Sequence, residues 1–247
     1  MSQQLTVTGM VLSSTASGEY DKRVVILTKE RGKISAFAKG ARRPNNHLAG
    51  AVFPCAFGTF AIYEGRNSNS IQTAEISNYF AELRQDMDAA CYAFYFLEFA
   101  DYYTREGNDE RKMLGLLYQS MRILTKKTIP LKLIRYIFEL KAIAINGEGP
   151  QAFQCVFCGS REPSLKFSVK AGGLVCDKCK SRAYDVTELQ TSTLYAIQYV
   201  IASPVEKVYT FTLKEDILKE FGKIVERYKE VYVEKRFKSL EILEELS

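Results

Sequence analysis

The chain has 247 residues, of which 47% are hydrophobic and 26% are charged, so it can bury one large core or several small ones. This composition excludes a disordered or fibrous protein. The chain has no window of about 18 uninterrupted apolar residues, and its first residues have neither the basic nor the apolar region of a secretion signal. We therefore expect a soluble, cytoplasmic protein.

Basic residues are concentrated at the start of the chain. Residues 1–50 hold eight Lys or Arg against three acidic residues, whereas the other 197 residues hold 26 of each, so the whole net charge of +5 comes from the first fifth. Such a cluster points to a polyanionic partner. The basic residues are Lys22, Arg23, Lys29, Arg31, Lys33, Lys39, Arg42 and Arg43.

The first 77 residues have the pattern of β-strands, because their apolar residues occur in short runs bounded by Gly, Pro, Asn and Ser. A hairpin turn at Glu30–Gly32 joins the second and third strands. Five strands in so short a stretch predict a small closed barrel, and the OB-fold is the commonest such barrel among nucleic-acid binders. The predicted strands are Leu5–Leu12, Arg23–Thr28, Lys33–Ala38, Thr59–Tyr63 and Ser70–Ile76.

From Asp86 onward the apolar residues recur at helical spacing. Two later helix starts fit the capping-box pattern, with Thr187 and Thr212 as the capping residues. The predicted helices are Asp86–Arg105, Asp109–Lys126, one that opens at Pro130 and ends at Asn146–Gly147, Glu188–Ala202, and Leu213–Val233.

Six cysteines are present, and four of them form two C-x-x-C pairs. Cys155 and Cys158 are separated from Cys176 and Cys179 by seventeen residues, a spacing typical of structural zinc sites. Four thiolates complete a zinc tetrahedron and leave no position for water, so we expect one structural Zn²⁺. Disulfides are disfavoured in a reducing cytosol, and a thioredoxin-like redox site needs one pair, not two.

The two other cysteines, Cys55 and Cys91, are expected to be small buried hydrophobic residues. Together these observations predict a multidomain α+β protein, in which an N-terminal five-stranded OB-fold β-barrel is followed by an all-α bundle with an inserted four-cysteine zinc module. The expected boundaries are 1–80 for the barrel, 81–150 and 186–247 for the helical domain, and 151–185 for the zinc module.

Catalytic motifs are missing from the sequence. His47 is the single histidine, and the chain has neither a Walker loop nor a Rossmann glycine triplet. A carboxylate-rich region between two helices holds acids that we expect to serve solvation and capping, because those of a two-metal nuclease should converge from several strands. These acids are Glu98, Asp101, Asp109 and Glu110. We therefore predict no catalytic residues and no enzyme activity.

A basic loop follows the third strand, where Lys39, Arg42 and Arg43 should lie at the barrel rim and contact phosphates. Taken alone, such a run can also be a solvated turn. With the basic residues of the adjoining strands and turns, we expect a continuous basic face. Nearby aromatic residues can stack on bases or belong to the core, and the sequence does not decide between the two. They are Tyr20, Phe37 and Tyr63.

Several short motifs, in this order along nearly the whole chain, resemble the RecO family of DNA repair and recombination mediator proteins. They are Gly9–Leu12, Asp21–Lys22, Leu27–Thr28, Gly32–Ile34, Ala38–Arg43, Arg135–Glu139 leading to Gly147 and Pro150, the first cysteine pair, and Phe237–Glu241. One departure is Asn45–His47, where many relatives have a more basic loop.

The resemblance implies an OB-fold, a helical domain and a zinc module that bind single- and double-stranded DNA and anneal complementary strands. It also implies partners. Such proteins work with RecR to help load RecA on strands coated by single-strand-binding protein, whose acidic C-terminal tail docks on the helical domain. A bacterial, nucleoid-associated location follows from the same resemblance.

Two other functions remain open at the level of the sequence. The first is an RNA-binding OB-fold protein with a zinc ribbon, which would prefer RNA and would not anneal DNA strands. The second is a non-catalytic scaffold whose basic face binds an acidic peptide. In that case the aromatic-rich helix around Phe94, Tyr95 and Phe96 would carry the function.

Overall fold

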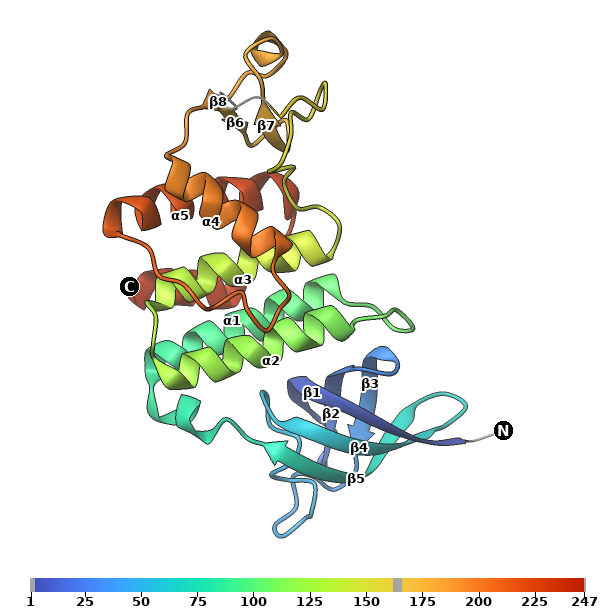
Figure 1. Cartoon of the computed structure of the whole chain (residues 1–247). Helices are drawn as coiled ribbons and strands as arrows, with labels where there is room; N and C mark the ends of the chain where they lie inside the picture. Colours follow the sequence, from blue (N-terminus) through green and yellow to red (C-terminus); the bar gives the residue numbers. More distant parts are fainter. Residues whose placement is uncertain (1–2, 162–165, 247) are drawn as a thin grey trace. The chain divides into compact units, whose positions relative to one another are not determined.

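The computed structural model describes residues 3–161 and 166–246 (Figure 1). These residues form two compact units, one made of residues 3–126 and 237–246, the other of residues 127–161 and 166–236. The predicted fold class, a five-stranded barrel followed by helices with an inserted four-cysteine segment, is confirmed. The domain boundaries given above stay a prediction. Within the described ranges, no helix is both long and apolar enough to cross a membrane.

Four antiparallel strand pairings and one parallel pairing, between β3 and β5, close the barrel. The strand order is β1-β2-β3-β5-β4, and β4 pairs with β1. This is the strand order of an OB-fold. The first strand continues five residues beyond its predicted end at Leu12, because a bulge between Val11 and Ser13 allows a polar stretch to pair with β2. The strands are β1 (Gln3–Ser17), β2 (Asp21–Thr28), β3 (Gly32–Ala38), β4 (Phe57–Glu64) and β5 (Asn69–Asn78).

Alternate residues of each strand fill the barrel, as the period of two requires. Val24 and Ile26 of β2 are fully buried there, and Phe60 of β4 is the largest side chain of this core. Leu48 and Val52, from the long segment between β3 and β4, join the same core. That segment, which contains the basic loop, is therefore anchored to the barrel by its own apolar side chains.

Helices α1 (Met87–Tyr103), α2 (Arg111–Lys126) and α6 (Lys238–Leu246) belong to the same unit as the barrel, and α1 packs against both of the others. The sequence analysis did not predict α6. Phe237 anchors it by stacking on Phe99 of α1, with ring centroids 4.9 Å apart. The amide and hydroxyl of Ser239 donate to Glu98 Oε2 at 3.1 and 2.6 Å. The last described residues of the chain thus complete the N-terminal unit.

The turn between β2 and β3 is held against the loop between α1 and α2. Gly32 has φ +65°, and a Cβ at this position would lie 2.4 Å from the carbonyl oxygen of Arg105, so only glycine fits. The amide of Lys33 donates to that same oxygen at 3.0 Å, and Gly107 N donates to Arg31 O at 3.0 Å. This end of the barrel is therefore fixed by backbone hydrogen bonds.

The second unit contains α3 (Leu131–Ile145), α4 (Thr191–Ala202) and α5 (Glu215–Tyr232). The predicted ends of α3 are confirmed, since Pro130 is its N-cap and Asn146 its C-cap, followed by Gly147 at φ +90°. Helix α3 also carries buried charged residues. One of them, Lys141, donates to two carbonyl oxygens at the C-terminal end of α4, which satisfies groups that the helix itself leaves free.

Both predicted capping boxes are wrong. Thr187 lies in the short strand β8, paired with Phe167, and α4 begins four residues later. Glu220 of α5 takes over the capping role there, because its carboxylate accepts from Gln190 N at 3.1 Å and from the hydroxyl of Thr193. Helix α5 begins after Lys214 without a side-chain cap, and acidic residues in its first turn favour the helix N-terminus.

A buried ion cluster joins α3 and α5. Glu139 is fully buried, and its Oε1 lies 3.0 Å from Arg135 Nε and 3.3 Å from Lys229 Nζ. One negative charge thus faces two positive charges in a region with little solvent. Arg135 Nη2 also lies 3.7 Å from Glu226 Oε1. Removal of the Glu139 carboxylate would leave an excess of positive charge in this region, which is costly.

Close packing between α3 and α5 depends on Gly222. A Cβ at Gly222 would lie 2.5 Å from the ring of Tyr136. We expect Gly222→Ala to lower the free energy of unfolding by about 1–3 kcal/mol through overpacking, although alanine itself favours the helix by roughly 1 kcal/mol. Urea unfolding of both proteins measures the change.

The control tests whether the ring of Tyr136 causes the loss of stability. In a Tyr136→Leu background, Gly222→Ala should be neutral or stabilising, because the flat ring no longer meets the new methyl group. An equal loss of stability in both backgrounds would show that the clash with Tyr136 is not the reason.

Candidate metal centre and nucleic-acid interface

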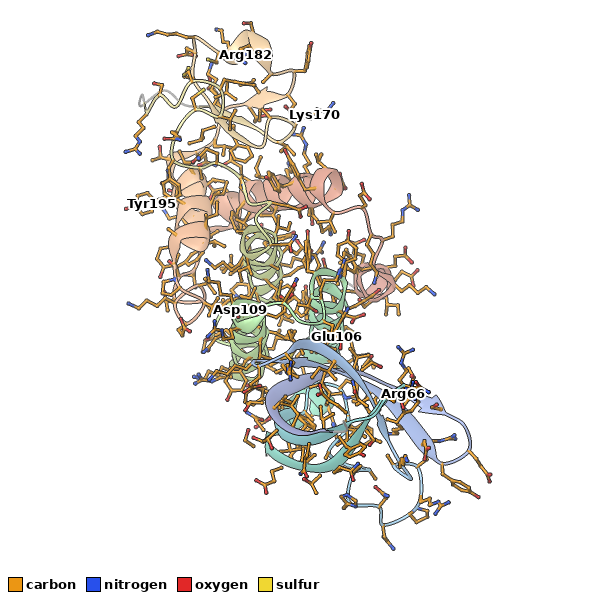
Figure 2. The ribbon with its side chains drawn as sticks, turned by 90° about the vertical axis from the view of Figure 1, so that its right-hand side faces the viewer. Arg66, Glu106, Asp109, Lys170, Arg182 and Tyr195 are labelled. Atoms are coloured by element: carbon orange, nitrogen blue, oxygen red, sulfur yellow. The ribbon has the colours of Figure 1, made fainter. Side chains whose placement is uncertain are left out.

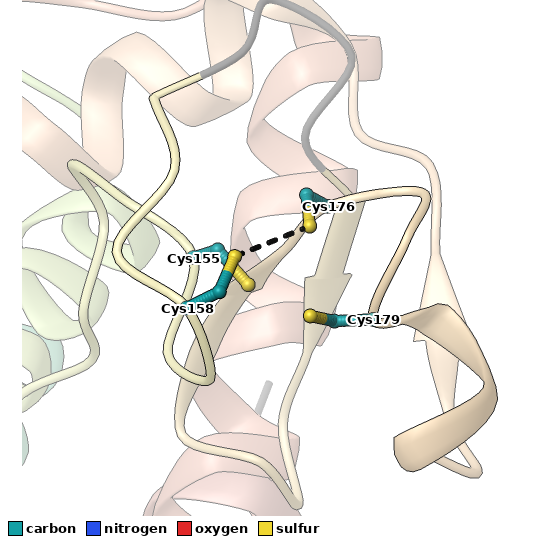
Figure 3. Close-up of side chains that lie close together, drawn as sticks. All are labelled: Cys155, Cys158, Cys176 and Cys179. Atoms are coloured by element: carbon teal, nitrogen blue, oxygen red, sulfur yellow. Dashed lines mark hydrogen bonds between the residues drawn. The ribbon is translucent and has the colours of Figure 1, made fainter.

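The four-cysteine module, residues 151–187, contains a small sheet of order β7-β6-β8, made by β6 (Lys166–Ser168), β7 (Gly173–Val175) and β8 (Val186–Thr187). Cys155 and Cys158 lie on one loop, and Cys176 and Cys179 lie on the turn that follows β7 (Figure 3). Their side chains point toward one another, and all four Sγ atoms lie within 4.8 Å of one another.

The geometry of this cluster fits a tetrahedral ion. With metal–sulfur bonds of about 2.3 Å, the edges of a tetrathiolate tetrahedron measure about 3.8 Å. The Sγ atoms of Cys158 and Cys176 are 3.5 Å apart, far longer than a disulfide, and all six cysteines are free thiols. Cys155, Cys176 and Cys179 are buried, whereas Cys158 is exposed. The four residues can therefore hold a metal ion.

The surroundings of the cysteines shift the pKa values of their thiols in opposite directions. Burial alone would raise the pKa of Cys155, but backbone amides of Phe157, Cys158 and Cys176 lower it to about 6. Burial, followed by hydrogen bonds to the other three thiols, raises the pKa of Cys179 to about 12. A divalent cation among the sulfurs would reverse that rise, because it stabilises thiolates. The donor set thus suits a cation.

The module is tied to helices α4 and α5 by specific hydrogen bonds. Gln198 Nε2 of α4 donates to Ala152 O at 2.7 Å. From α5, Tyr232 Oη donates to Val169 O at 3.1 Å, and Tyr228 Oη donates at 2.8 Å to Glu148 O in the segment that leads into the module. The second unit therefore combines its helices and its cysteine cluster in one packed body.

The remaining two cysteines lie in the other unit. Cys55 is buried, and its burial raises the pKa of its thiol to about 12, so it is protonated at neutral pH. Cys91 is half-buried on α1. The expectation of buried small residues is met fully by Cys55 and in part by Cys91.

Five of the eight predicted DNA-binding residues gather at one end of the barrel. The tip of the β1–β2 hairpin, the start of β2 and the loop after β3 all meet there, because Ser17 pairs with Asp21 and Lys22 pairs with Ala38. We call this surface the basic barrel end. It contains Lys22, Arg23, Lys39, Arg42, Arg43 and, from the segment before α1, Arg84.

Hydrogen bonds hold the basic loop against the hairpin tip. The backbone amide of Arg42 donates to Tyr20 O, and its Nη1 donates to Gly18 O, both at 2.9 Å. Gly40 N donates to Asp21 Oδ1 at 2.7 Å. The loop therefore has a defined position, and Lys39 and Arg43 are exposed on it.

Two aromatic rings carry cations at this end. Arg43 lies 4.4 Å from the ring centre of Tyr20, and Phe53 lies between Lys22 at 4.6 Å and Arg84 at 5.0 Å. Both rings are 42% exposed. Stacked in this way, the cations keep their outer faces open to phosphates. Phe53 and Arg84 were not predicted as part of this surface, since no local sequence motif connects them with Lys22.

The outer wall of the barrel continues this surface. Strand pairing places Arg23, Phe37, Ser70 and Tyr63 in one row across β2, β3, β5 and β4, all on the face opposite the core. Tyr63 is exposed and Phe37 is half-buried, so neither belongs to the barrel core. The row combines a cation with two rings, as stacking surfaces for single strands do.

The other three predicted residues lie at the opposite end of the β2–β3 hairpin, so the structure does not form one continuous basic face. At about 3.3 Å per residue, Lys22 and Lys29 lie roughly 20 Å apart along β2. Lys29 and Arg31 are exposed at the turn. Lys33 is half-buried, and its Nζ donates to Asp101 O and Oδ1 of α1 at 2.6 and 3.0 Å.

The Asn45–His47 segment, which departs from the family pattern, forms a turn. Asn45 has φ +60°, Asn46 Oδ1 accepts from Leu48 N at 2.9 Å, and His47 Nε2 donates to Gln72 O at 3.1 Å. These residues support the loop that carries Lys39 and Arg43.

The acidic residues that a nuclease would need are separately engaged. Asp101 pairs with Lys33, Asp109 with Arg111, and Glu110 Oε1 accepts from Arg105 N at 3.0 Å. The one group of metal-ligating side chains found in the described part of the chain is the cysteine cluster. The acids at these positions therefore act in local pairing and capping.

The fold and these surfaces define a class of protein: an OB-fold barrel with a basic, aromatic-bearing end, joined to a helical unit with a four-cysteine metal module. Two family models match the chain, Recombination protein O N terminal over residues 1–80 and Recombination protein O C terminal over residues 84–241. The chain belongs to the RecO family of DNA repair proteins.

Similar proteins cover almost the same length. The DNA repair protein RecO of Alkaliphilus metalliredigens is 32% identical over 240 residues, which are 96% of this chain and 98% of that protein. The DNA repair protein RecO of Acetivibrio thermocellus is 28% identical over 98% of this chain and 97% of its own. The Bacillus subtilis protein of the same name is 26% identical over 96% and 93%.

Proposed function

We propose that this protein is a non-catalytic recombination mediator that binds single- and double-stranded DNA at the basic barrel end and anneals complementary strands. The observation that carries the proposal is the set of six cations at one end of an OB-fold barrel, three of them stacked on exposed rings. Membership of a DNA repair family supports DNA as the polyanion.

The proposed mechanism is electrostatic. Lys and Arg side chains displace the counterions of the phosphate backbone and reduce the repulsion between two strands. Base pairing between the strands then selects the complementary sequence, so the protein itself needs little sequence specificity. Tyr63 offers an exposed ring on which an unpaired base can stack before it pairs, whereas the rings of Tyr20 and Phe53 already carry cations.

The metal in this proposal is one structural Zn²⁺, held by Cys155, Cys158, Cys176 and Cys179. A cluster of four sulfurs suits zinc, and with four protein ligands the ion has no position for a reacting water. Its contribution would be to hold the two loops of the module together.

The proposed partners are those of other mediators: RecR, the acidic tail of single-strand-binding protein, and through them RecA. Helix α1 has an exposed apolar stripe that supports docking of such a tail. Met87 and Phe94 are exposed and Cys91 is half-buried between them at helical spacing. Lys238 of α6 is exposed beside this helix and offers a charge for an acidic peptide.

Salt dependence tests the DNA site. Replacing Lys39, Arg42 and Arg43 by Ala should lower the log–log salt slope of single-strand binding by about 2, at roughly 0.7 per lost phosphate contact. The matched control removes three exposed cations from α2, Lys112, Arg122 and Lys126. Fluorescence anisotropy with a labelled oligonucleotide at several salt concentrations measures both.

A slope unchanged in the barrel variant, or reduced equally in the α2 control, would contradict the assignment of the site. Preference for RNA over DNA of the same sequence would favour the RNA-binding alternative. The scaffold alternative requires exposed aromatic residues around position 95. It is less well supported, because Tyr95 and Phe96 are fully buried and only Phe94 of the three is exposed.

A further inference from the structure

The stretch after the second cysteine pair has a surface that the proposed function does not use. Lys178, Lys180, Arg182 and Tyr184 alternate with other residues along residues 178–184, and all four are exposed. Tyr184 is 97% exposed, so its ring has almost no packing within this chain. Figure 2 shows Arg182 on the outer end of the module.

The acidic residues of this stretch are engaged elsewhere. Asp177 lies 3.6 Å from Lys166 Nζ. Asp185 accepts from the hydroxyl of Ser168 and from Lys170 N at 3.1 Å, and lies 3.7 Å from Arg227. Throughout the part of the module that the structure describes, no carboxylate forms an ion pair with Lys180 or Arg182. The positive charge of these two side chains is therefore available to a partner.

Arg182 is held in a fixed position. Its guanidinium lies 4.3 Å from the ring centre of Phe157, a residue of the first C-x-x-C pair. Its N–H groups remain at the edge of the stacked plane, where a phosphate can accept from two of them. The metal-binding turn thus positions a phosphate-binding side chain.

We infer that Lys180, Arg182 and Tyr184, which we call the module face, form a second binding site for single-stranded DNA. Lys180 and Arg182 would contact phosphates, and an unpaired base would stack on Tyr184. An acidic peptide would use the cations and leave the ring without a role, so the combination favours a nucleic acid. The inference rests on the proposed function for the class of ligand.

A second site matters for strand annealing. The basic barrel end belongs to one compact unit and the module face to the other. One chain can thus hold two strands, one on each unit, and raise the effective concentration of each for its complement.

A different role for the cations has to be separated from this one. Four thiolates on a divalent ion carry a net charge of about −2. Lys180 and Arg182 could partly neutralise this charge and so stabilise the bound metal. In that case their removal would weaken metal binding and leave DNA affinity unchanged. The module face requires the opposite result.

The experiment uses the full chain with Lys39, Arg42 and Arg43 already replaced by Ala, so that the binding that remains reports on other sites. In this background, Lys180→Ala with Arg182→Ala should lower the log–log salt slope for a short oligothymidylate by about 1.4. Tyr184→Ala should weaken binding about five-fold or more through lost stacking, and Tyr184→Phe should retain it. Metal content should be the same in every variant.

Matched controls come from the same unit. Lys207→Ala with Lys223→Ala also removes two exposed cations, and Tyr195→Ala removes another exposed ring, 71% exposed on α4 (Figure 2). Both controls should bind like the background protein.

Four outcomes would count against the inference. Normal residual binding in the module variants would overturn it while leaving the barrel site intact, and so would an equal loss of binding in the controls. Loss of metal with unchanged DNA affinity would assign the cations to the metal instead. If the wild-type protein binds no DNA, the proposed function fails as well.

Discussion

Removal of the metal from the four-cysteine module is expected to unfold that module and to loosen the helices packed on it. Structural zinc contributes about 10 kcal/mol or more to the folding of modules of this size. Here the described part of the module has three short strands, and buried sulfurs form the centre of its small core. Without the ion, no bond would hold the two cysteine-bearing loops together.

Chelation of the wild-type protein and the substitution Cys176→Ser both test this expectation. Thermal unfolding followed by circular dichroism should shift to lower temperature, and limited proteolysis should cut within residues 151–187. Bound zinc should fall from one ion per chain to none. Cys91→Ser serves as the control, because Cys91 lies on α1 in the other unit and should keep both the metal and the melting curve. An unchanged melting curve in protein shown to be metal-free would contradict a structural role for the ion.

Replacement of Glu139 by Gln is expected to destabilise the second unit strongly. Its carboxylate is fully buried between Arg135 and Lys229. Gln keeps the volume but removes the charge, so Arg135 and Lys229 lose the carboxylate that they share in a region of low dielectric constant. Arg135 keeps a longer contact, since its Nη2 lies 3.7 Å from Glu226 Oε1. Breaking a buried ion pair in this way costs about 3–5 kcal/mol. Urea unfolding monitored by fluorescence or circular dichroism measures the loss.

A surface pair on α5 gives the matched control. Glu215 and Lys219 also form a helical Glu–Lys ion pair, at 2.7 Å, but both side chains are largely exposed. Glu215→Gln should leave the free energy of unfolding almost unchanged, because solvent screens the pair. If Glu139→Gln costs no more than Glu215→Gln, the buried cluster does not stabilise the contact between α3 and α5.

Local chemistry explains what the sequence could predict. Each C-x-x-C turn is determined by its own residues, and two such turns meet wherever one ion can bind both, so the convergence of Cys155 with Cys176 follows from spacing. The ends of α3 were predictable for the same reason, since Pro130 and Gly147 act on the backbone at their own positions. The barrel followed from short strands and turns.

Contacts between residues far apart in the sequence explain most of the features that could not be predicted from the sequence. Charge counting along the first 50 residues takes no account of strand direction, so it combined Lys22 with Lys29, which lie at opposite ends of β2. The partner of Lys33, Asp101, is 68 residues away and removes that lysine from the open surface. Arg84 reaches the basic barrel end only because the chain returns to Phe53 after the fifth strand.

The errors at the helix starts have the same origin. Thr187 has the sequence of a capping residue, but β6 offers it a strand partner, and Glu220 then caps α4 from another helix. Tertiary contacts thus override a local preference. Helix α6 was missed because Phe237, which anchors it, acts through the aromatic side chains of α1.

We propose that this member of the RecO family brings complementary DNA strands together at the basic barrel end. Annealing of two labelled complementary strands, one precoated with single-strand-binding protein, tests it most directly. We expect the wild-type protein to accelerate annealing at low salt, the triple Lys39, Arg42 and Arg43 alanine variant to lose most of the acceleration, and the α2 control variant to retain it. No acceleration by the wild-type protein at low salt, or full acceleration by the triple variant, would contradict the account.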